Sequence, residues 1–216
     1  MKIIPNFAVF EGGDGSGTTS QMSLLQKRFQ KVKEPVFFPT SEPTGGPVGR
    51  LIRSALKKEI SLEPGTLAAL FAADRHEHLY APGGIAGRCA AGELVVCDRY
   101  TLSSLVYQGI ECGDEVPRAL NASFPAPQLL IYLDIEPELA FRRLKTRENL
   151  EIYENIEFMR KVREKYLSLL GEFRETGVNV AVIDASKSPE EVFQSVWREF
   201  AKMPILKTAG FAGQNP

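Results

Sequence analysis

The sequence has few cysteines, almost no net charge and no long apolar run. Its 216 residues include three cysteines, Cys89, Cys97 and Cys112, whose number is odd and whose spacing fits no metal site. We therefore expect free thiols in a reducing cytoplasm. The net charge of −1 argues against nucleic acid as the main partner, since such binding usually needs a basic face. Apolar runs such as Leu129 to Leu133 are too short to cross a bilayer. A cytoplasmic globular protein with one core and no membrane partner is predicted.

Short apolar segments alternate with longer segments of helical periodicity. The predicted strands are Phe7 to Phe10, Val36 to Phe38, Leu94 to Cys97, Leu129 to Asp134 and Val180 to Asp184. The predicted helices are Thr18 to Gln30, Val48 to Leu56, Pro64 to Tyr80, Leu102 to Tyr107, Pro137 to Thr146, Tyr153 to Thr176 and Pro189 to Lys202. Nearly continuous apolar strands are typical of a parallel sheet that helices cover on both faces. The alternation therefore predicts an α/β domain with right-handed crossovers. Residues 204–216 show no clear period and are predicted to be a loosely held tail.

The segment "FEGGDGSGTTSQ" connects the first predicted strand to the first predicted helix. Its glycines match the spacing of a phosphate-binding loop, and Thr19 stands where such a loop holds magnesium. Backbone N–H groups and the positive end of the following helix would face the anion. The predicted ATP-phosphate ligands are Gly12, Gly13, Asp14, Gly15, Ser16, Gly17, Thr18 and Thr19. The motif requires lysine where this chain has Thr18, so a glycine-rich turn without a ligand is the alternative.

A second segment, "DRYTLSSLVYQG", begins where the third predicted strand ends. Asp98 at the carboxyl end of that strand can reach magnesium together with Thr19. The following helix places Ser103 and Ser104 one turn before Tyr107 and Gln108, respectively, on a polar face able to hydrogen-bond a nucleotide base. The alternative is a solvated helix start that Thr101 caps.

These two segments together resemble the thymidylate kinase family of nucleoside monophosphate kinases. The family pattern D-R-Y-x-x-S-x-x-x-Y-Q-G follows a loop of the form F-E-G-x-D-G-x-G. The blocks "TSEPTGGPVGRLIR", "LFAADRHEHL", "LIYLDIEPELAFRR" and "VIDASKSPEEVFQSVW" also look like family segments. The resemblance implies a doubly wound five-stranded parallel sheet, with one kinase domain over residues 1–203 and a helical lid around 142–154. It implies that dTMP and ATP with Mg2+ give dTDP and ADP, and that the protein is a homodimer.

The resemblance also implies roles for individual residues. The acceptor dTMP would be bound by Asp14, Arg53, Phe71, Arg75, Arg99, Ser103, Tyr107, Gln108 and Tyr153. In the family the phenylalanine and the arginine one helical turn after it contact thymine, and the two other arginines grip the acceptor phosphate. The loop passing the adenine of ATP would be Ala185, Ser186, Lys187 and Ser188. Taken without the family, Phe71 would more often be a core residue and Arg75 a surface residue.

The sequence departs from the family pattern mainly on the ATP side. Thr18 replaces the loop lysine, Ile152 replaces a lid arginine, and Ser41 replaces the arginine before the glutamate of the "SEP" segment. Compensating cations could come from Arg142, Arg143, Lys145 and Arg147, although a solvated basic face is the alternative. The predicted catalytic set is therefore Asp14, Asp98, Arg99, Arg143 and Arg147. Low turnover is one expectation; a nucleotide-binding protein that has lost most catalysis, or a kinase for another monophosphate, is the alternative.

Overall fold

The computed structural model describes residues 2–30, 35–145 and 152–209. In these residues one sheet of five parallel strands has the order β2-β3-β1-β4-β5. The strands are β1 (Ile3–Glu11), β2 (Phe37–Ser41), β3 (Leu94–Asp98), β4 (Ala126–Asp134) and β5 (Asn179–Asp184). The doubly wound fold predicted from the sequence is confirmed. Because β1 lies between β3 and β4, the strand order reverses at β1, and ligands of such sheets bind at this point.

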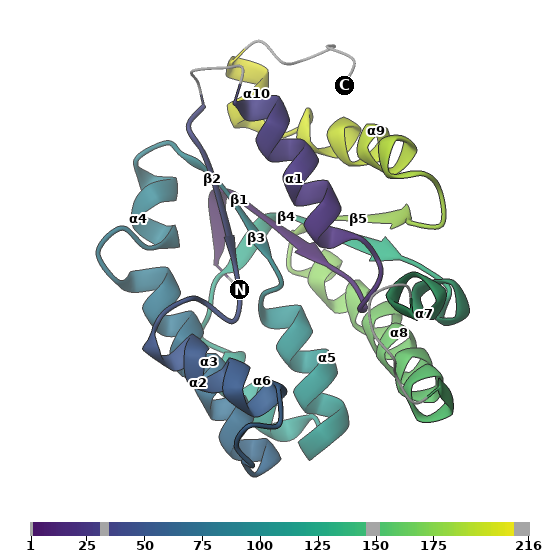
Figure 1. Ribbon diagram of the computed structural model, residues 1–216. Coiled ribbons are helices and arrows are strands. Elements are labelled where there is room, and N and C mark those ends of the chain that lie inside the picture. The colour runs from purple at the N-terminus through teal and green to yellow at the C-terminus, as the bar shows by residue number, and fades with distance from the viewer. Residues whose placement is uncertain (1, 31–34, 146–151, 210–216) are drawn as a thin grey trace.

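Two helical layers cover the sheet (Figure 1). One face packs against α1 (Thr18–Phe29), α9 (Pro189–Phe200) and α10 (Pro204–Thr208). The other face packs against α3 (Pro64–Tyr80), α4 (Ile85–Ala90), α5 (Thr101–Cys112) and α8 (Ile152–Glu175). Strand β4 shows why both layers form: Leu129, Ile131 and Leu133 point to the first layer, while Leu130 and Tyr132 point to the second. All five side chains are buried, as expected for an internal parallel strand.

Three further helices pack against α3, α5 or α8 of the second layer. These are α2 (Pro47–Leu56), α6 (Glu115–Asn121) and α7 (Pro137–Lys145). The start of α3 agrees with the prediction because the Glu63 side chain accepts hydrogen bonds from the N–H groups of Gly65 (2.8 Å) and Thr66 (3.3 Å). Likewise, Ser188 and Glu191 form a capping box that starts α9.

The structure differs from the prediction at several helices. Helix α5 extends to Cys112, five residues beyond its predicted end, and the short helices α4 and α6 were not predicted. Residues 204–208 form α10, where Leu206 is completely buried. This part of the predicted tail is therefore packed on the core, and residues 210–216 lie outside the described residues. Within the described ranges, each helix is too short or too polar to span a membrane.

Candidate active site

Two adjoining pockets open at the carboxyl edge of the sheet. The first, of about 690 Å³, lies between α1, the end of β2, α3 and α5; the second, of about 920 Å³, lies over the glycine-rich loop and α7. Five residues line both pockets: Asp14, Thr19, Ser23, Asp98 and Arg99. The parallel register aligns Phe10 of β1 with Asp98 of β3, so the loop after β1 and the residues after β3 meet. The structure therefore places the two segments singled out in the sequence around one continuous space.

The glycine-rich loop turns tightly between β1 and α1. Gly15 and Gly17 have φ angles of 82° and 97°, in a backbone region that residues with a Cβ atom rarely adopt. A Cβ atom on Gly15 would also lie 2.7 Å from the carbonyl oxygen of Ala140 in α7. The N–H of Ser16 donates to the carbonyl of Gly13 at 3.1 Å. All members of the predicted loop except Gly12 line the second pocket, as an anion-binding loop requires.

Asp98 receives hydrogen bonds from both threonines at the start of α1. The hydroxyl groups of Thr18 and Thr19 donate to Asp98 Oδ2 at 3.2 and 3.4 Å. Thr18, at the lysine position of the motif, therefore bonds the same carboxylate as its neighbour. Burial raises the pKa of Asp98, whereas the charge of Arg99 and the two hydroxyl groups lower it.

The chemistry of this pair suits a hard divalent cation. Asp98 Oδ1 is buried and has no hydrogen-bond partner among the described residues. A carboxylate oxygen and a threonine hydroxyl are ligands that Mg2+ prefers, and a bound cation would offset the unfavourable burial of the ionised Asp98. The predicted metal ligands, Thr19 and Asp98, are thus together and chemically suitable.

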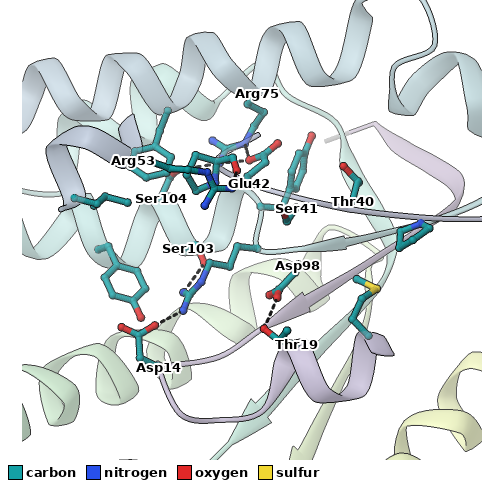
Figure 2. A pocket seen from close by; sticks show the side chains of 18 of the residues that line it. Asp14, Thr19, Thr40, Ser41, Glu42, Arg53, Arg75, Asp98, Ser103 and Ser104 are labelled. Carbon is teal, nitrogen blue, oxygen red and sulfur yellow. Dashed lines mark hydrogen bonds and ion pairs between the residues drawn. The ribbon is translucent and has the colours of Figure 1, made fainter. Parts of the chain in front are cut away.

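Arg99 lines both pockets, as do Asp14 and Asp98, whose carboxylates are labelled in Figure 2. Its guanidinium donates to Asp14 Oδ1 at 2.5 Å and to Ser103 Oγ at 3.4 Å, and its Cζ atom lies 5.2 Å from the centre of the Tyr107 ring. The Asp14 carboxylate is largely exposed, so solvent screens its attraction to Arg99 and the charge of Arg99 is only partly neutralised. The predicted contact set of Asp14, Arg99, Ser103 and Tyr107 is therefore assembled in the structure.

Arg75 forms the buried wall of the first pocket. Its guanidinium is 1% exposed and donates to Glu42 Oε2 (2.9 Å from Nε), to Ser104 Oγ (3.0 Å) and to Asn121 Oδ1. It also lies over the ring of Tyr100, at 5.1 Å. Glu42, Ser104 and Asn121 hold the planar fork in one orientation, so Arg75 is a fixed group of the pocket wall. The alternative of a surface arginine is wrong.

Glu42 and Asn121 were missed as partners of Arg75 by the sequence reasoning. Glu42 also faces His78 Nδ1 at 3.1 Å, and His78 Nε2 lies 2.7 Å from Thr40 Oγ1. The side chains of Glu42, His78 and Cys97 form a compact group. Since both ring nitrogens have partners and Glu42 already pairs with Arg75, the geometry indicates an ion-pair network here.

The remaining predicted acceptor residues other than Tyr153 line the first pocket. Arg53 comes from α2, Phe71 from α3, and Tyr107 and Gln108 from α5. Arg53 is exposed and its Nη2 donates to the carbonyl of Pro43. Gln108 is buried, and its Oε1 has no partner in the described part of the chain. An unpaired buried amide oxygen at a pocket is a ready hydrogen-bond acceptor for a ligand N–H.

The ATP side of the predicted site is only partly within the described residues. Arg142, Arg143, Ala185 and Lys187 line the second pocket together with the loop. Arg143 Nη2 donates to the carbonyls of Ser186 (3.3 Å) and Lys187 (3.4 Å), which connects α7 to the predicted adenine loop. Ser188, the last member of that loop, caps α9.

Two predicted site residues of the lid are not tested. Arg147 belongs to residues 146–151 of the predicted lid, which lie outside the described residues. The backbone of Tyr153 belongs to α8, but its side chain is not described. The proposal that Arg143 and Arg147 act together therefore stays a prediction.

Comparison with known proteins agrees with the motif resemblance. The family model described as thymidylate kinase matches residues 10–196. The chain is 40% identical to the "Putative thymidylate kinase" of Treponema pallidum, over 96% of this chain and 100% of that protein. It is 41% identical to the "Probable thymidylate kinase" of Pyrobaculum aerophilum and 38% identical to that of Methanocaldococcus jannaschii, each over 88% of this chain and 93% of the relative.

Proposed function

This chain belongs to the thymidylate kinase family, and we propose that it transfers the γ-phosphoryl group of ATP to the phosphate of dTMP. The observation that carries the proposal is the continuity of the two pockets. Asp14, Asp98 and Arg99 line both of them, so a donor on the glycine-rich loop and an acceptor in the first pocket would meet there.

The first pocket fits a pyrimidine monophosphate. The guanidinium groups of Arg99 and of the exposed Arg53 would bind the acceptor phosphate, because their planar forks match phosphate oxygens. The ring of Phe71 offers a stacking surface, and Gln108 Oε1 can accept the N–H of a pyrimidine ring. The fixed Arg75 fork would donate to a carbonyl of the base. Thymine has both an N–H donor and carbonyl acceptors, so the polar groups of the pocket match it.

The second pocket fits the phosphates of ATP. The backbone N–H groups of the loop and the start of α1 would bind the phosphate oxygens, and the adenine would pass residues 185–188. Thr19 and Asp98 would hold Mg2+, which neutralises charge on the phosphates when it is bound. Arg142 and Arg143 line this pocket and can supply the positive charge that the loop lacks at Thr18.

The transfer is direct. An oxygen of the dTMP phosphate attacks the γ-phosphorus, the bond to the β–γ bridging oxygen breaks, and ADP leaves with that oxygen, with no covalent enzyme intermediate. Arg99 lies at the pocket junction, where charge spreads over the moving group, and positive charge there lowers the barrier. Asp14 orients this arginine through their 2.5 Å ion pair.

A coupled ADP-release assay with a panel of monophosphates tests the proposal. We expect ADP release with dTMP that exceeds the rates with UMP, CMP and AMP. A faster rate with UMP, CMP or AMP would indicate a kinase for another acceptor, and equal rates with all four would contradict selectivity for dTMP. Tight dTMP binding by calorimetry without ADP release would indicate a binding protein on the kinase fold and would contradict the proposal.

A cytoplasmic homodimer completes the proposal. The free thiols of Cys89, Cys97 and Cys112 suit a reducing compartment. Leu51 on α2 is 44% exposed, and we place it in the contact with the second copy. Sedimentation of the wild type and of Leu51→Glu tests this; a monomeric wild type would contradict it.

A further inference from the structure

Glu11 is a fully buried carboxylate to which the transfer mechanism assigns no role. It is the last residue of β1 and is 0% exposed. Four donors surround it. Oε1 accepts from the N–H groups of Tyr100 (3.0 Å) and Ser103 (3.2 Å), and Oε2 accepts from the hydroxyl groups of Ser103 (2.6 Å) and Tyr166 (3.1 Å). A buried carboxylate satisfied in this way fixes the groups that donate to it.

One donor on Oε1, the N–H of Tyr100, directly follows a residue with an unusual backbone conformation. Arg99, directly before Tyr100, has a φ of 69°, in the left-handed region. This conformation is unfavourable for a residue other than glycine, so neighbouring contacts must hold it. Two bonds to the end of β1 do so: the N–H of Arg99 donates to the carbonyl of Phe10 at 2.8 Å, and the next N–H donates to Glu11.

The same carboxylate caps the start of α5. Tyr100 is the N-cap residue of this helix and its own side chain makes no capping bond. Glu11 accepts the N–H of the N-cap residue and that of the third helical residue, Ser103. When Glu11 is ionised, its negative charge also lies at the positive end of the helix dipole. One side chain from β1 therefore fixes both the backbone beside Arg99 and the first turn of the helix that carries Tyr107 and the base-facing residues.

We propose that Glu11 is a positioning residue, which holds the left-handed backbone of Arg99 so that the guanidinium faces the acceptor phosphate at the junction of the two pockets. The proposal rests on the proposed function, since it takes that phosphate as the target of Arg99. From this backbone conformation the guanidinium reaches Asp14 and Ser103. The role depends on the position of an acceptor atom beside the two N–H groups.

Three substitutions separate the position of the acceptor from the charge. Glu11→Gln keeps an oxygen at the same distance from the backbone, and its amide can donate to the two hydroxyl groups. Glu11→Met keeps the length and volume but removes the acceptor. It also removes a buried ionisable group. The loss of its unfavourable desolvation favours folding. Glu11→Asp keeps the charge but draws it back by one methylene. Tyr166→Phe is the matched control, because it removes a donor to Oε2 and leaves both N–H contacts of Oε1 intact.

The experiment measures the Kd of dTMP and the Kd of ATP separately by calorimetry for these variants and for Arg99→Ala. We expect Glu11→Met and Glu11→Asp to weaken dTMP binding tenfold or more, with the ATP Kd within threefold of wild type. Glu11→Gln should restore the dTMP Kd to within threefold of wild type, and Tyr166→Phe should keep it within twofold.

Other outcomes overturn the proposal in recognisable ways. If Arg99→Ala weakens dTMP binding while Glu11→Met and Glu11→Asp do not, Glu11 does not position Arg99 and the proposed function stands. If Glu11→Gln is as impaired as Glu11→Met, the charge rather than the position of the acceptor matters. A similar loss of ATP affinity would show general damage to the fold. An unchanged dTMP Kd in Arg99→Ala would overturn the proposed acceptor site together with the role of Glu11.

Discussion

Replacing Thr18 by lysine tests whether the glycine-rich loop binds the ATP phosphates and lacks only the positive charge of the usual lysine. The hydroxyl of Thr18 donates to Asp98 at 3.2 Å and the side chain faces the second pocket. The adjacent glycines already set the turn, and lysine is at least as good a helix former as threonine. Thr18→Lys therefore needs no new backbone geometry, and its ammonium would reach the β- and γ-phosphates.

The magnitude follows from the charge that develops during transfer. Two unit charges about 4 Å apart interact by about 4 kcal/mol at an effective dielectric constant of about 20. Only the part that grows between ground state and transition state accelerates the reaction. If the interaction is stronger in the transition state by about a third of this energy, the barrier falls by about 1.4 kcal/mol, which makes transfer tenfold faster. The lost hydrogen bond to Asp98 should lower the free energy of unfolding by about 1.5–3 kcal/mol.

Single-turnover quench-flow measures the transfer step directly, and calorimetry measures the affinity for dTMP, which should change little. Thr18→Gln is the matched control, because it has a long polar side chain without the charge and should give no acceleration.

The competing account is that lid arginines already occupy the place of the lysine. Thr18→Lys would then raise the rate only when Arg143→Ala and Arg147→Ala are also present. A rate that rises in neither background would refute both accounts and indicate a site not built for transfer.

Three further predictions concern the acceptor arginine, the loop glycine and the buried carboxylate. Arg99→Ala should raise the Kd of dTMP by about 10- to 150-fold (about 1.5–3 kcal/mol for a lost charge-assisted bond) and change that of ATP less; calorimetry showing the reverse would contradict our division of the site. Gly15→Ala should lower the free energy of unfolding in urea by about 1–3 kcal/mol, because φ is 82° and the new Cβ would lie 2.7 Å from a carbonyl oxygen. Gly13→Ala, whose Cβ would meet its nearest atom at 3.9 Å, is the stability control, and equal losses would refute this reasoning. Burial raises the pKa of Glu11 from 4.5 to about 7, so the folded state keeps a proton that the unfolded chain releases. Stability should therefore fall by about 3 kcal/mol between pH 4.5 and 7 relative to Glu11→Gln, and parallel stability–pH curves would rule this out.

The parts of the fold that the sequence predicted are those set by local pattern. Strand β3 is continuously apolar because it is buried on both faces, and α3 begins at a proline preceded by a capping glutamate. Helices α4 and α6 have six and seven residues, too few for a helical period to be visible. Their existence depends on contacts with distant residues, such as the packing of Ile85 against the β1–β3 face of the sheet.

The candidate site divides in the same way. The loop, Asp98 and Arg99 could be predicted because glycine spacing and strand ends are local signals. The partners of Arg75 could not, because Glu42 and Asn121 lie 33 and 46 residues away in the chain and Asn121 belongs to a helix that was missed. Glu11 gave no signal beyond being the polar end of an apolar strand, since its role arises from donors 89 to 155 residues away.

The second pocket has positive side chains outside the glycine-rich loop, which itself has Thr18 in place of lysine. The Thr18 hydroxyl is bonded to Asp98, so the loop side of the second pocket offers backbone N–H groups and hydroxyl groups. Arg142, Arg143 and Lys187 line the same pocket from α7 and the adenine loop, and Arg99 lines it from the acceptor side. Because Arg143 is held by carbonyls of the adenine loop, α7 is connected to the segment predicted to contact the base of ATP. Donor binding and the placement of positive charge would then depend on the same contacts, so removing Arg143 should weaken ATP binding as well as transfer.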